Sequence, residues 1–513
     1  MQLLHPRDIP ELDRRAEAEA GFSPRLLMER AGLAVAQAAA KHARGVGPAL
    51  IFCGSGNNGG DGYAAALALG KMGYTPFCVD VFEKGQRTEE GQYFLEEYKK
   101  KYGRPTTLAH GDASVILGSL ENSTVAVDAV FGTGFSGELP PVCRLLAKVL
   151  CESPVPVVAV DVPLGCDAET GEVMNGGYTA AATVCLSFYK RGLWSYPARE
   201  RTGEMTLADL GIPRAMGAAF GEDTVLTDEA FAARLLGPRG KNTHKGSFGH
   251  ALAFVGCRLY RGAAHLASEA CLRMGAGLLT VASEEAVLSS LLRRLPEAIL
   301  HPMPPFDGAA SLTVDLGKAE EGKTAALAGS GLGRSPAVKE AVLAMLTREG
   351  CPLVLDADAL NALSEVGASD VLCRAERQVI LTPHPMEFAR MMGLPVGEVQ
   401  AHRLPLAELF ARETGTVLVL KGAGTVITDG KRTYVNSTGS PALAKGGTGD
   451  VLAGAILGLL AGGLPPLEAA ALGVYLHGRA GDVLEEKYSD RGVLPSGLGR
   501  QMAVEIRKIQ KGK

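Results

Sequence analysis

A short apolar strand, a glycine-rich turn and a helix follow one another early in the chain, and this order constrains the fold more than any other feature. Residues 49–54 read as a buried strand, and residues 63–72 read as a helix. Three glycines between them fit the GxGxxG spacing of a dinucleotide-binding turn: Gly54, Gly56 and Gly59. Asp80 ends the next strand, about where a ribose-binding acid is expected. A simple dehydrogenase is therefore one interpretation.

The same turn carries three polar side chains at its tightest part, Asn57, Asn58 and Asp61. A turn that only binds pyrophosphate needs bare backbone, so these side chains argue against the simple dehydrogenase. They either brace the loop as Asx-turns or contact a ligand.

Two later strands end in carboxylates. Asp128 ends the strand that begins at Val125 and precedes a second glycine turn, and Asp161 ends the strand that begins at Val155. Each could be a strand-end cap. The carboxyl ends of parallel strands line the ligand crevice, so convergence with Asn58 instead predicts an oxygen-lined cation site, without identifying the cation.

The second half repeats the alternation of strands and helices. Strands end in four segments rich in glycine, proline or charged residues: Gly329 to Gly333, Asp356 to Asp358, Thr382 to Pro385, and Lys421 to Thr425. This alternation predicts a mostly parallel, doubly wound sheet. The 513-residue length predicts two domains. Small residues and turn formers between residues 211 and 224 predict a linker, which places the domains at 1–215 and 225–513.

Composition limits the partners of the chain. A formal charge of −4 gives no electrostatic footprint for nucleic acid or an anionic membrane. The ten cysteines form no CxxC pair, which predicts neither a disulfide framework nor a structural zinc site. The N-terminus lacks a signal-peptide pattern, and no long apolar span follows. We expect a cytoplasmic protein with small-molecule partners.

The stretch Ala444 to Asp450 contains three glycines and opens into the apolar run 451–460. Bare backbone N–H groups at a helix N-terminus, with the positive end of the helix dipole, favour an anion. Asp450 could simply cap this helix. If a phosphoryl group occupies the anion site, Asp450 is instead placed to take a proton from the attacking hydroxyl.

No P-loop motif occurs, so the glycine-rich segments at 421–425 and 446–449 are the candidate nucleotide turns. His384 lies between two prolines at a strand end, where it is either a buried hydrogen-bonded histidine or a substrate contact. Lys245 is either a phosphate-steering residue or a solvated loop lysine.

Residues 1 to 215 resemble the NAD(P)H-hydrate epimerase family, which has a Rossmann-like fold. The resemblance rests on Asn-Asn-Gly-Gly-Asp-Gly from Asn57, Asp-Ala-Val-Phe-Gly-Thr-Gly from Asp128, and Asp-Val-Pro from Asp161. It implies that Asn58 and Asp128 ligate potassium and that Asp161 acts in proton transfer. It also implies a binding site for the hydrated dinucleotide formed by Asn57, Asn58, Gly59, Gly60, Asp61, Gly132, Thr133, Gly134, Phe135, Ser136, Gly137, Glu138 and Asp161.

Lys190 also falls where the family has a lysine, although a lone lysine at a strand end is more often solvated. Leu164 departs from the family, which has a serine there. If the serine ligates potassium through its hydroxyl, leucine removes a ligand and weakens the site. If it ligates through its backbone carbonyl, leucine changes nothing.

The second half resembles the NAD(P)H-hydrate dehydratase branch of the ribokinase-like kinases, through residues 436–450 and the Thr-Pro-His-Pro segment. Ser440, Ala442, Leu443 and Met386 depart from that pattern. The resemblance implies that Asp450 is the catalytic base. It implies hydrated-dinucleotide contacts from Ala263, Gly331, His384 and Asp450, and nucleotide contacts from Lys421, Gly422, Ala423, Gly424, Thr425 and Gly449.

Together the resemblances imply a bifunctional metabolite-repair enzyme. Its first domain would epimerise R- and S-NAD(P)HX, and its second would dehydrate the S form with ADP as cosubstrate, giving AMP and phosphate. They also imply K⁺, Mg²⁺ and a homo-oligomer of four or more chains. The alternative is a small-molecule kinase of ribokinase-like fold fused to a non-catalytic dinucleotide-binding domain.

Overall fold

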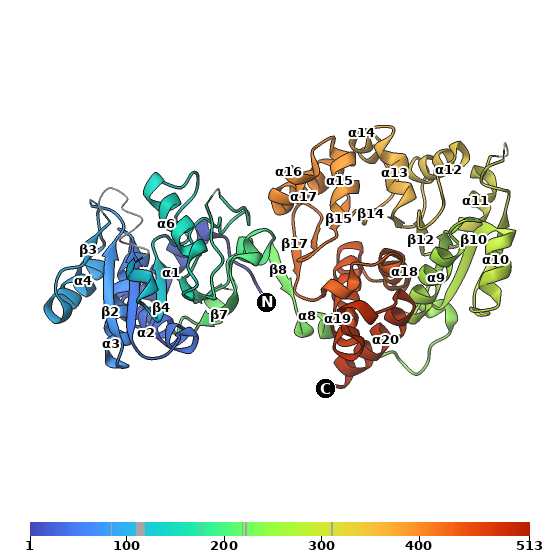
Figure 1. Cartoon of the computed structure of the whole chain (residues 1–513). Helices are drawn as coiled ribbons and strands as arrows, with labels where there is room; N and C mark the ends of the chain where they lie inside the picture. The colour runs from blue at the N-terminus through green and yellow to red at the C-terminus, as the bar shows by residue number, and fades with distance from the viewer. Residues whose placement is uncertain are drawn as a thin grey trace. The chain divides into compact units, whose positions relative to one another are not determined.

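The structure is a computed structural model of the whole chain, and it describes residues 1–83, 85–108, 118–174, 176–217, 219–220, 223–308 and 311–512. The chain forms two compact units (Figure 1). One unit is Gln2–Thr224, and the other is Val225–Lys513 together with Met1. No helix in the described part of the chain is long and apolar enough to cross a membrane.

The N-terminal unit is built on a seven-stranded sheet in the order β3-β2-β1-β4-β5-β6-β7, and every neighbouring pair is parallel. The order reverses between β1 and β4, which is the topological switch point of a doubly wound sheet. The strands are β1 Pro48–Cys53, β2 Thr75–Asp80, β3 Thr106–Thr107, β4 Val125–Ala129, β5 Val157–Val160, β6 Ala182–Leu186 and β7 Glu204–Ala208.

Alternate residues of these strands face two apolar clusters. Ile51 and Val127 face the cluster that holds helices α2, α3 and α4, whereas Phe52 and Ala126 face the cluster that holds α6. This alternation follows from the two-residue period of a strand. The helices are α1 Ile9–Ala20, α2 Pro24–His42, α3 Asn57–Lys71, α4 Glu89–Tyr102, α6 Pro141–Glu152 and α7 Arg214–Gly217, with short 3₁₀ helices at Pro6–Asp8, Arg191–Trp194 and Ala198–Glu200.

The C-terminal unit has a ten-stranded sheet in the order β11-β10-β9-β12-β13-β14-β15-β16-β17-β8. The run from β11 to β15 is parallel, and β16 and β17 are antiparallel additions. Here the order reverses between β9 and β12. The strands are β8 Thr224–Thr227, β9 His250–Phe254, β10 Leu278–Glu284, β11 Ile299–Met303, β12 Ala325–Ala328, β13 Leu353–Leu355, β14 Val379–Leu381, β15 Val417–Leu420, β16 Val426–Thr428 and β17 Thr433–Asn436.

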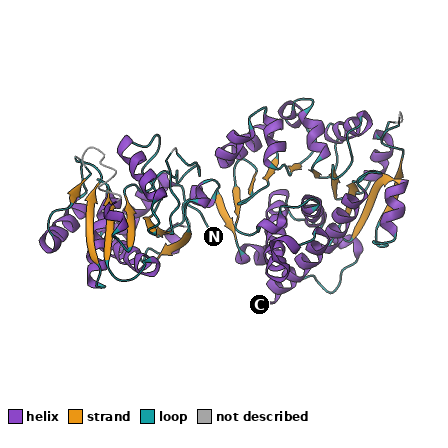
Figure 2. Cartoon of the chain, in the orientation of Figure 1, coloured by secondary structure: helices purple, strands orange, loops and turns teal. Residues whose placement is uncertain are grey.

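Helices cover both faces of this sheet (Figure 2), and two apolar clusters lie between helices and sheet, one on each face. One cluster contains residues of α8, α9, α10, α18, α19 and α20, and the other contains residues of α11 to α17. The helices are α8 Glu229–Leu235, α9 Arg261–Arg273, α10 Glu285–Leu292, α11 Thr313–Glu320, α12 Pro336–Leu346, α13 Asp358–Ser364, α14 Ala368–Leu372, α15 Pro385–Met392, α16 Val396–Ala401, α17 Arg403–Thr414, α18 Thr448–Ala461, α19 Pro466–Gly492 and α20 Pro495–Lys511, with 3₁₀ helices at Lys245–Phe248 and Pro441–Leu443.

The prediction of two doubly wound α/β units is confirmed. The segment 211–224, which we expected to be a linker, holds the short helix α7, and its residues 218, 221 and 222 lie outside the described part. Ile212 is buried beside Leu4 and Leu12, so the start of this segment packs into the N-terminal unit.

Candidate active sites

Glycines bring the ends of β1 and β4 together at the switch point of the N-terminal unit. A Cβ on Gly54 would lie 1.9 Å from the carbonyl oxygen of Val130, and a Cβ on Gly59 would lie 2.0 Å from that of Gly54. Only glycine allows these approaches. Helix α3 already begins at Asn57, so the expected loop is shorter and its polar residues occupy the first turns of the helix.

The two asparagines of this turn have different surroundings. Asn57 is exposed, and its Oδ1 accepts a hydrogen bond from Thr88. Asn58 is buried, and its Nδ2 donates to the carbonyl of Phe131 at 2.9 Å. That bond places the Asn58 amide oxygen next to Gly132, where a Cβ on the glycine would lie 3.4 Å from it. The start of α3 is thus tied to the turn after β4.

Asp128 is fully buried and its carboxylate accepts three hydrogen bonds. The backbone N–H of Val130 donates to Oδ1 at 3.1 Å, and Oδ2 accepts from the N–H of Leu164 and the hydroxyl of Tyr178, both at 2.8 Å. Burial raises the pKa of Asp128, and these donors oppose the rise. A carboxylate has about four lone-pair positions, so about one remains.

Asp161 is held by a buried ion pair at the end of β5. Its backbone has a φ of 65°, which is unusual for a residue with a side chain. The ammonium of Lys190 and the N–H of Leu186 both donate to Asp161 Oδ1. Lys190 is only 1% exposed and also donates to the Leu186 carbonyl at 3.0 Å. The expectation that Lys190 is solvated was wrong, because its ammonium is needed to neutralise Asp161.

Two further carboxyls lie within electrostatic range of this ion pair. Asp61 is buried, and burial together with the charges of Asp161 and Asp13 raises its pKa well above the usual value. Asp13, on α1, is exposed, yet the surrounding protein and the charge of Asp161 raise its pKa to about 6. Asp61 therefore holds its proton more tightly than an exposed aspartate does, and it lies close to the Asp161–Lys190 ion pair.

The remaining N-terminal candidates differ in their exposure to solvent. The turn 132–138 is exposed in its second half, and Phe135 stacks on Phe131 with ring centroids 4.1 Å apart. The side chain of Leu164 is buried in the apolar cluster with α6. Asp80, the expected ribose acid, accepts hydrogen bonds from Tyr63 and Arg87 within the unit.

Glycines also build the switch point of the C-terminal unit. A Cβ on Gly329 would lie 1.7 Å from the carbonyl oxygen of Asp356, and Gly331 has a φ of 66°. A Cβ on Gly331 would lie 2.6 Å from the Cβ of Ala263 and 2.9 Å from that of Tyr260. The structure thus brings together Ala263 and Gly331, two of the predicted substrate contacts.

Asp356 connects the ends of four neighbouring strands. It is 1% exposed, and its Oδ2 accepts from the hydroxyl of Ser330 at 3.1 Å. Its Oδ1 accepts from Thr382 at 2.8 Å and from the ammonium of Lys421 at 3.0 Å. These residues follow β12, β13, β14 and β15 in sheet order. The next residue, Ala357, has a φ of 49°.

Asp450 lies in the first turn of α18, where the chain enters the helix through Gly447 with a φ of 100°. Burial and the charge of Asp356 raise the pKa of Asp450 to about 7, while Ser330 and Lys421 oppose the rise. A Cβ on Gly449 would lie 3.4 Å from Lys421 Nζ. The helix N-terminus, the ammonium of Lys421 and a carboxyl that can accept a proton near neutral pH therefore occupy one site.

His384 caps helix α15. Its Nδ1 accepts from the N–H of Glu387, and Glu387 accepts from the N–H of His384. The ring is 47% exposed, so the buried-histidine alternative was wrong, and the cap leaves the other ring nitrogen 3.4 Å from Glu387. Lys245 is exposed, as expected for a solvated loop lysine.

Sequence reasoning named the strand ends but missed the side chains that connect them. Ser330, Asp356, Thr382 and Glu387 were not among the predicted site residues, and neither was Asp13. The Asp-Ala-Asp segment at the end of a predicted strand was the available signal for Asp356. No local pattern indicates that a serine and a threonine on other strands meet it.

Two family comparisons cover most of the chain. Residues 251–503 match the family described as NAD(P)H-hydrate dehydratase, and residues 25–192 match the family described as YjeF-related protein N-terminus. The first match contains Asp356, Lys421 and Asp450. The second contains Asn58, Asp128 and Asp161, and it begins after Asp13.

Full-length relatives share both halves. The bifunctional NAD(P)H-hydrate repair enzyme Nnr of Moorella thermoacetica is 36% identical, over 99% of this chain and 97% of that protein. The protein of the same name from Escherichia coli is 32% identical, over 96% of this chain and 91% of that protein.

A solved structure resembles the C-terminal unit. The ADP/ATP-dependent NAD(P)H-hydrate dehydratase from Bacillus subtilis, co-crystallised with ATP and Mg²⁺, is 36% identical with a TM-score of 0.50, and the match covers 56% of this chain and 99% of that one.

Proposed function

We propose a residue-level mechanism for this chain, which belongs to the family of bifunctional NAD(P)H-hydrate repair enzymes. The chain restores hydrated reduced nicotinamide dinucleotides. The N-terminal unit is the epimerase, and the C-terminal unit is the dehydratase that uses ADP or ATP. The assignment of individual residues is our proposal.

Dehydration starts at Asp450. Its carboxylate takes the proton of the C6 hydroxyl, and the C6 oxygen bonds to the terminal phosphorus of ADP while the bond from that phosphorus to AMP breaks. The ring nitrogen then donates its lone pair as the C6–O bond breaks and phosphate leaves. Loss of a proton from C5 restores the 5,6 double bond. Phosphorylation is needed because hydroxide is a poor leaving group.

The other residues of the site bind and orient. The N–H groups at the start of α18 and the ammonium of Lys421 stabilise the phosphoryl oxygens as charge develops on them. Asp356 holds Lys421 in place and raises the pKa of Asp450. The turn 421–425 binds the nucleotide, and Ala263, Gly331 and His384 contact the hydrated dinucleotide.

In the epimerase, two carboxyls with different surroundings supply an acid and a base. The ion pair with Lys190 suits Asp161 to the role of base, and the raised pKa of the buried Asp61 suits it to the role of acid. Asp161 removes the proton of the C6 hydroxyl and Asp61 protonates the ring nitrogen, so the C6–N bond breaks and C6 becomes a planar aldehyde. Closure on the other face returns both protons and gives the other epimer.

The N-terminal turn has oxygen donors that fit a potassium ion. The amide oxygen of Asn58 is turned toward Gly132, and Asp128 keeps about one lone pair. We propose that these two residues hold potassium and that Leu164 contributes only its carbonyl oxygen, because its side chain lies in the apolar core. The ion would fix the first turn of α3 against the turn after β4.

Magnesium is expected through the nucleotide phosphates. Among the described residues, no group of three or more His, Cys, Asp or Glu side chains could hold a metal ion. We therefore propose that Mg²⁺ binds mainly phosphate and water oxygens, as it commonly does in nucleotide sites.

The observation that carries this proposal is Asp450, a carboxyl with a pKa of about 7 beside Lys421 at the N-terminus of α18. The test is to incubate the protein with mixed NADHX epimers, with and without ADP, and to follow the near-ultraviolet absorbance of reduced nicotinamide. We expect complete recovery only with ADP. A stable phosphorylated product would contradict the dehydratase assignment. Recovery of only one epimer would contradict the epimerase assignment.

We further propose that the two units are independent folding domains and that the whole chain forms a homo-oligomer. The structure suggests ending the first fragment after Thr224, because Asp223 pairs with the buried His5 and Leu3 donates to the Thr224 carbonyl. Fragments 1–224 and 225–513 should each be soluble and carry one activity. Sedimentation of the full chain would report the oligomeric state.

A further inference from the structure

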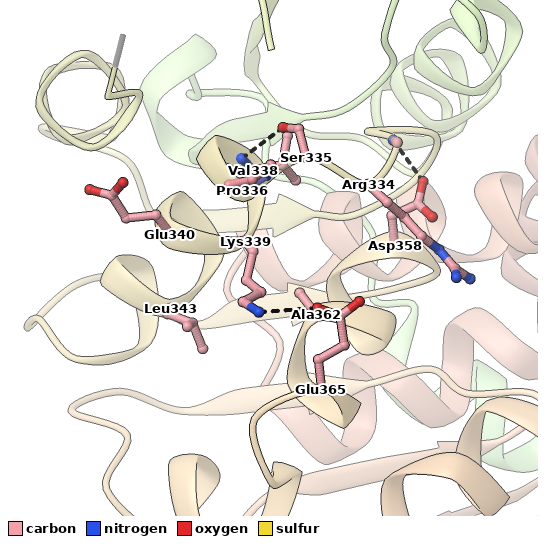
Figure 3. A pocket seen from close by; sticks show the side chains of 11 residues that line it. Arg334, Ser335, Pro336, Val338, Lys339, Glu340, Leu343, Asp358, Ala362 and Glu365 are labelled. Carbon is pink, nitrogen blue, oxygen red and sulfur yellow. Dashed lines mark hydrogen bonds and ion pairs between the residues drawn. The ribbon is translucent and has the colours of Figure 1, made fainter. Parts of the chain in front are cut away.

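A cavity of about 390 Å³ lies beside the dehydratase site, between the first turns of α12 and helix α13 (Figure 3). Figure 3 shows Lys339 reaching from α12 toward Glu365, and Asp358 turned toward the backbone of the 333–335 turn. The volume is within the range of about 300–1,000 Å³ typical of small-molecule sites.

The lining of the cavity is close in sequence to the residues that we propose to contact the hydrated nicotinamide, and one of its charges acts on Asp450. It begins at Gly333, two residues after Gly331, and the N–H of Gly333 donates to Asp358 at 2.8 Å. Asp358 is also one of the charges that raise the pKa of Asp450. The cavity is lined by residues that come after β12 and β13, whereas the turn 421–425 comes after β15. The cavity therefore lies on the side of the site that we propose for the dinucleotide, away from the turn that we propose for the nucleotide.

The lining does not suit a phosphate. Helix α12 starts with Pro336, which has no N–H, and the N–H of Val338 is taken by the hydroxyl of Ser335. The charged residues of the lining are three carboxylates, Asp358, Glu340 and Glu365, and two cations, Arg334 and Lys339, which gives a net charge of −1. Lys339 is also paired with Glu365 at 3.1 Å.

The lining does suit a neutral group that carries hydroxyls. Val338, Leu343 and Ala362 offer apolar walls for a flat base. Carboxylates accept hydrogen bonds from ribose hydroxyls, and an acidic residue in such a position discriminates against a 2′-phosphate.

We propose that this cavity is the subsite for the adenosine end of the hydrated dinucleotide, and that its acidic lining makes the dehydratase prefer NADHX to NADPHX. The proposal rests on the proposed dehydratase function. NADHX and NADPHX differ only in the 2′-phosphate. The proposal adds a preference between these two substrates and attributes it to Glu365 and the other carboxylates of the lining.

The test compares the full-length protein with Glu365→Gln, using each S-epimer and saturating ADP. We expect the wild-type protein to have the higher kcat/KM for NADHX. Glu365→Gln removes a negative charge and frees Lys339, so it should raise kcat/KM for NADPHX relative to NADHX by about twofold to fivefold, a small factor because the pair is partly exposed. Glu349→Gln is the matched control, since Glu349 is exposed beyond the other end of α12.

Equal use of both substrates, a preference for NADPHX, or a ratio that Glu365→Gln leaves unchanged would overturn the proposal. A selective loss of NADPHX use in Arg334→Gln would also overturn it, because the cavity would then bind phosphate. Calorimetric binding of NADH and NADPH to both proteins gives the same comparison without turnover. An absence of dehydration combined with the expected shift in NADPH binding would contradict the proposed function and leave the subsite supported.

Discussion

The two units build their sites at the same position in the fold but treat their carboxylates differently. In the N-terminal unit, Asp128 accepts three hydrogen bonds and Asp161 is locked to Lys190. In the C-terminal unit, Asp356 is the buried carboxylate that accepts hydrogen bonds from three side chains, whereas the pKa of Asp450 is raised to about 7. A shared architecture therefore gives individual carboxyls different surroundings, which is how we propose that it supports two chemistries.

Both sites also have a strained residue within two positions of the end of a strand. Asp161 has a φ of 65° and Ala357 has a φ of 49°, and neither is glycine. Residues in this region cost of order 1–3 kcal/mol and persist where their surroundings hold them. At Asp161 the strained residue itself carries the carboxylate, whereas at Ala357 it separates two carboxylates, Asp356 and Asp358.

The largest expected change in rate is for a substitution of Asp450. Asp450→Asn keeps the shape of the site but cannot accept the hydroxyl proton, so we expect ADP-dependent dehydration to fall by about 10²–10⁴. Epimer exchange should be unchanged, because Asp161 and Asp61 lie in the other unit. Both rates can be measured on one preparation. Wild-type dehydration by this variant would show that Asp450 is not the base.

The next prediction concerns the stability of the N-terminal unit. Lys190→Met leaves the Asp161 carboxylate buried without its partner, which should lower the free energy of unfolding of this unit by about 3–5 kcal/mol. Trp194, the single tryptophan of the chain, lies in this unit and can report its denaturation. The exposed Lys148→Met is the control, with an expected change within about 0.5 kcal/mol. Equal effects of the two substitutions would mean that the buried pair has no special role.

The third prediction is a difference in pH dependence. The pKa of Asp450 is about 7, so its basic form is lost below that pH and the dehydration rate should fall by about tenfold per pH unit. Because that pKa is raised from 3.8, the folded state holds the proton more tightly than the unfolded state. The free energy of unfolding should therefore decrease as pH rises from about 4 to about 7.

Asp450→Asn removes that contribution, so it should melt at a higher temperature than the wild type at pH 8 while being less active. A dehydration rate that does not change between pH 6 and pH 8, with ADP saturating, would contradict the shifted pKa. The rate of epimer exchange over the same pH range provides the internal comparison.

The smallest expected effect is at Leu164. Its side chain lies in the apolar cluster with α6, so Leu164→Ser adds no oxygen to the turn, and the half-saturating potassium concentration for epimerisation should not change. Asn58→Ala, which removes an amide oxygen from the turn, should raise that concentration. A clear drop for Leu164→Ser would show that the hydroxyl reaches the ion, and would restore the side-chain alternative.

The sequence located both switch points and Asp450 because each lies in a local pattern of strand, glycine turn and helix. It did not show which lysine pairs with which carboxylate. Lys421 is 65 residues from Asp356, and Lys190 is 29 residues from Asp161. Which strand ends meet depends on the order of strands in the sheet, and a pattern within one strand does not contain that order. The burial of Lys190 was missed for the same reason.

The four-strand connection through Asp356 bears on how this enzyme could be engineered. A library that varies the turn 421–425, which we propose to bind the nucleotide, should leave Lys421 unchanged, since its ammonium donates a hydrogen bond to Asp356. Ala423 is exposed and has no such attachment, whereas Gly422 lies directly against the guanidinium of Arg403. Directed evolution of cosubstrate choice therefore has its safest starting position at Ala423.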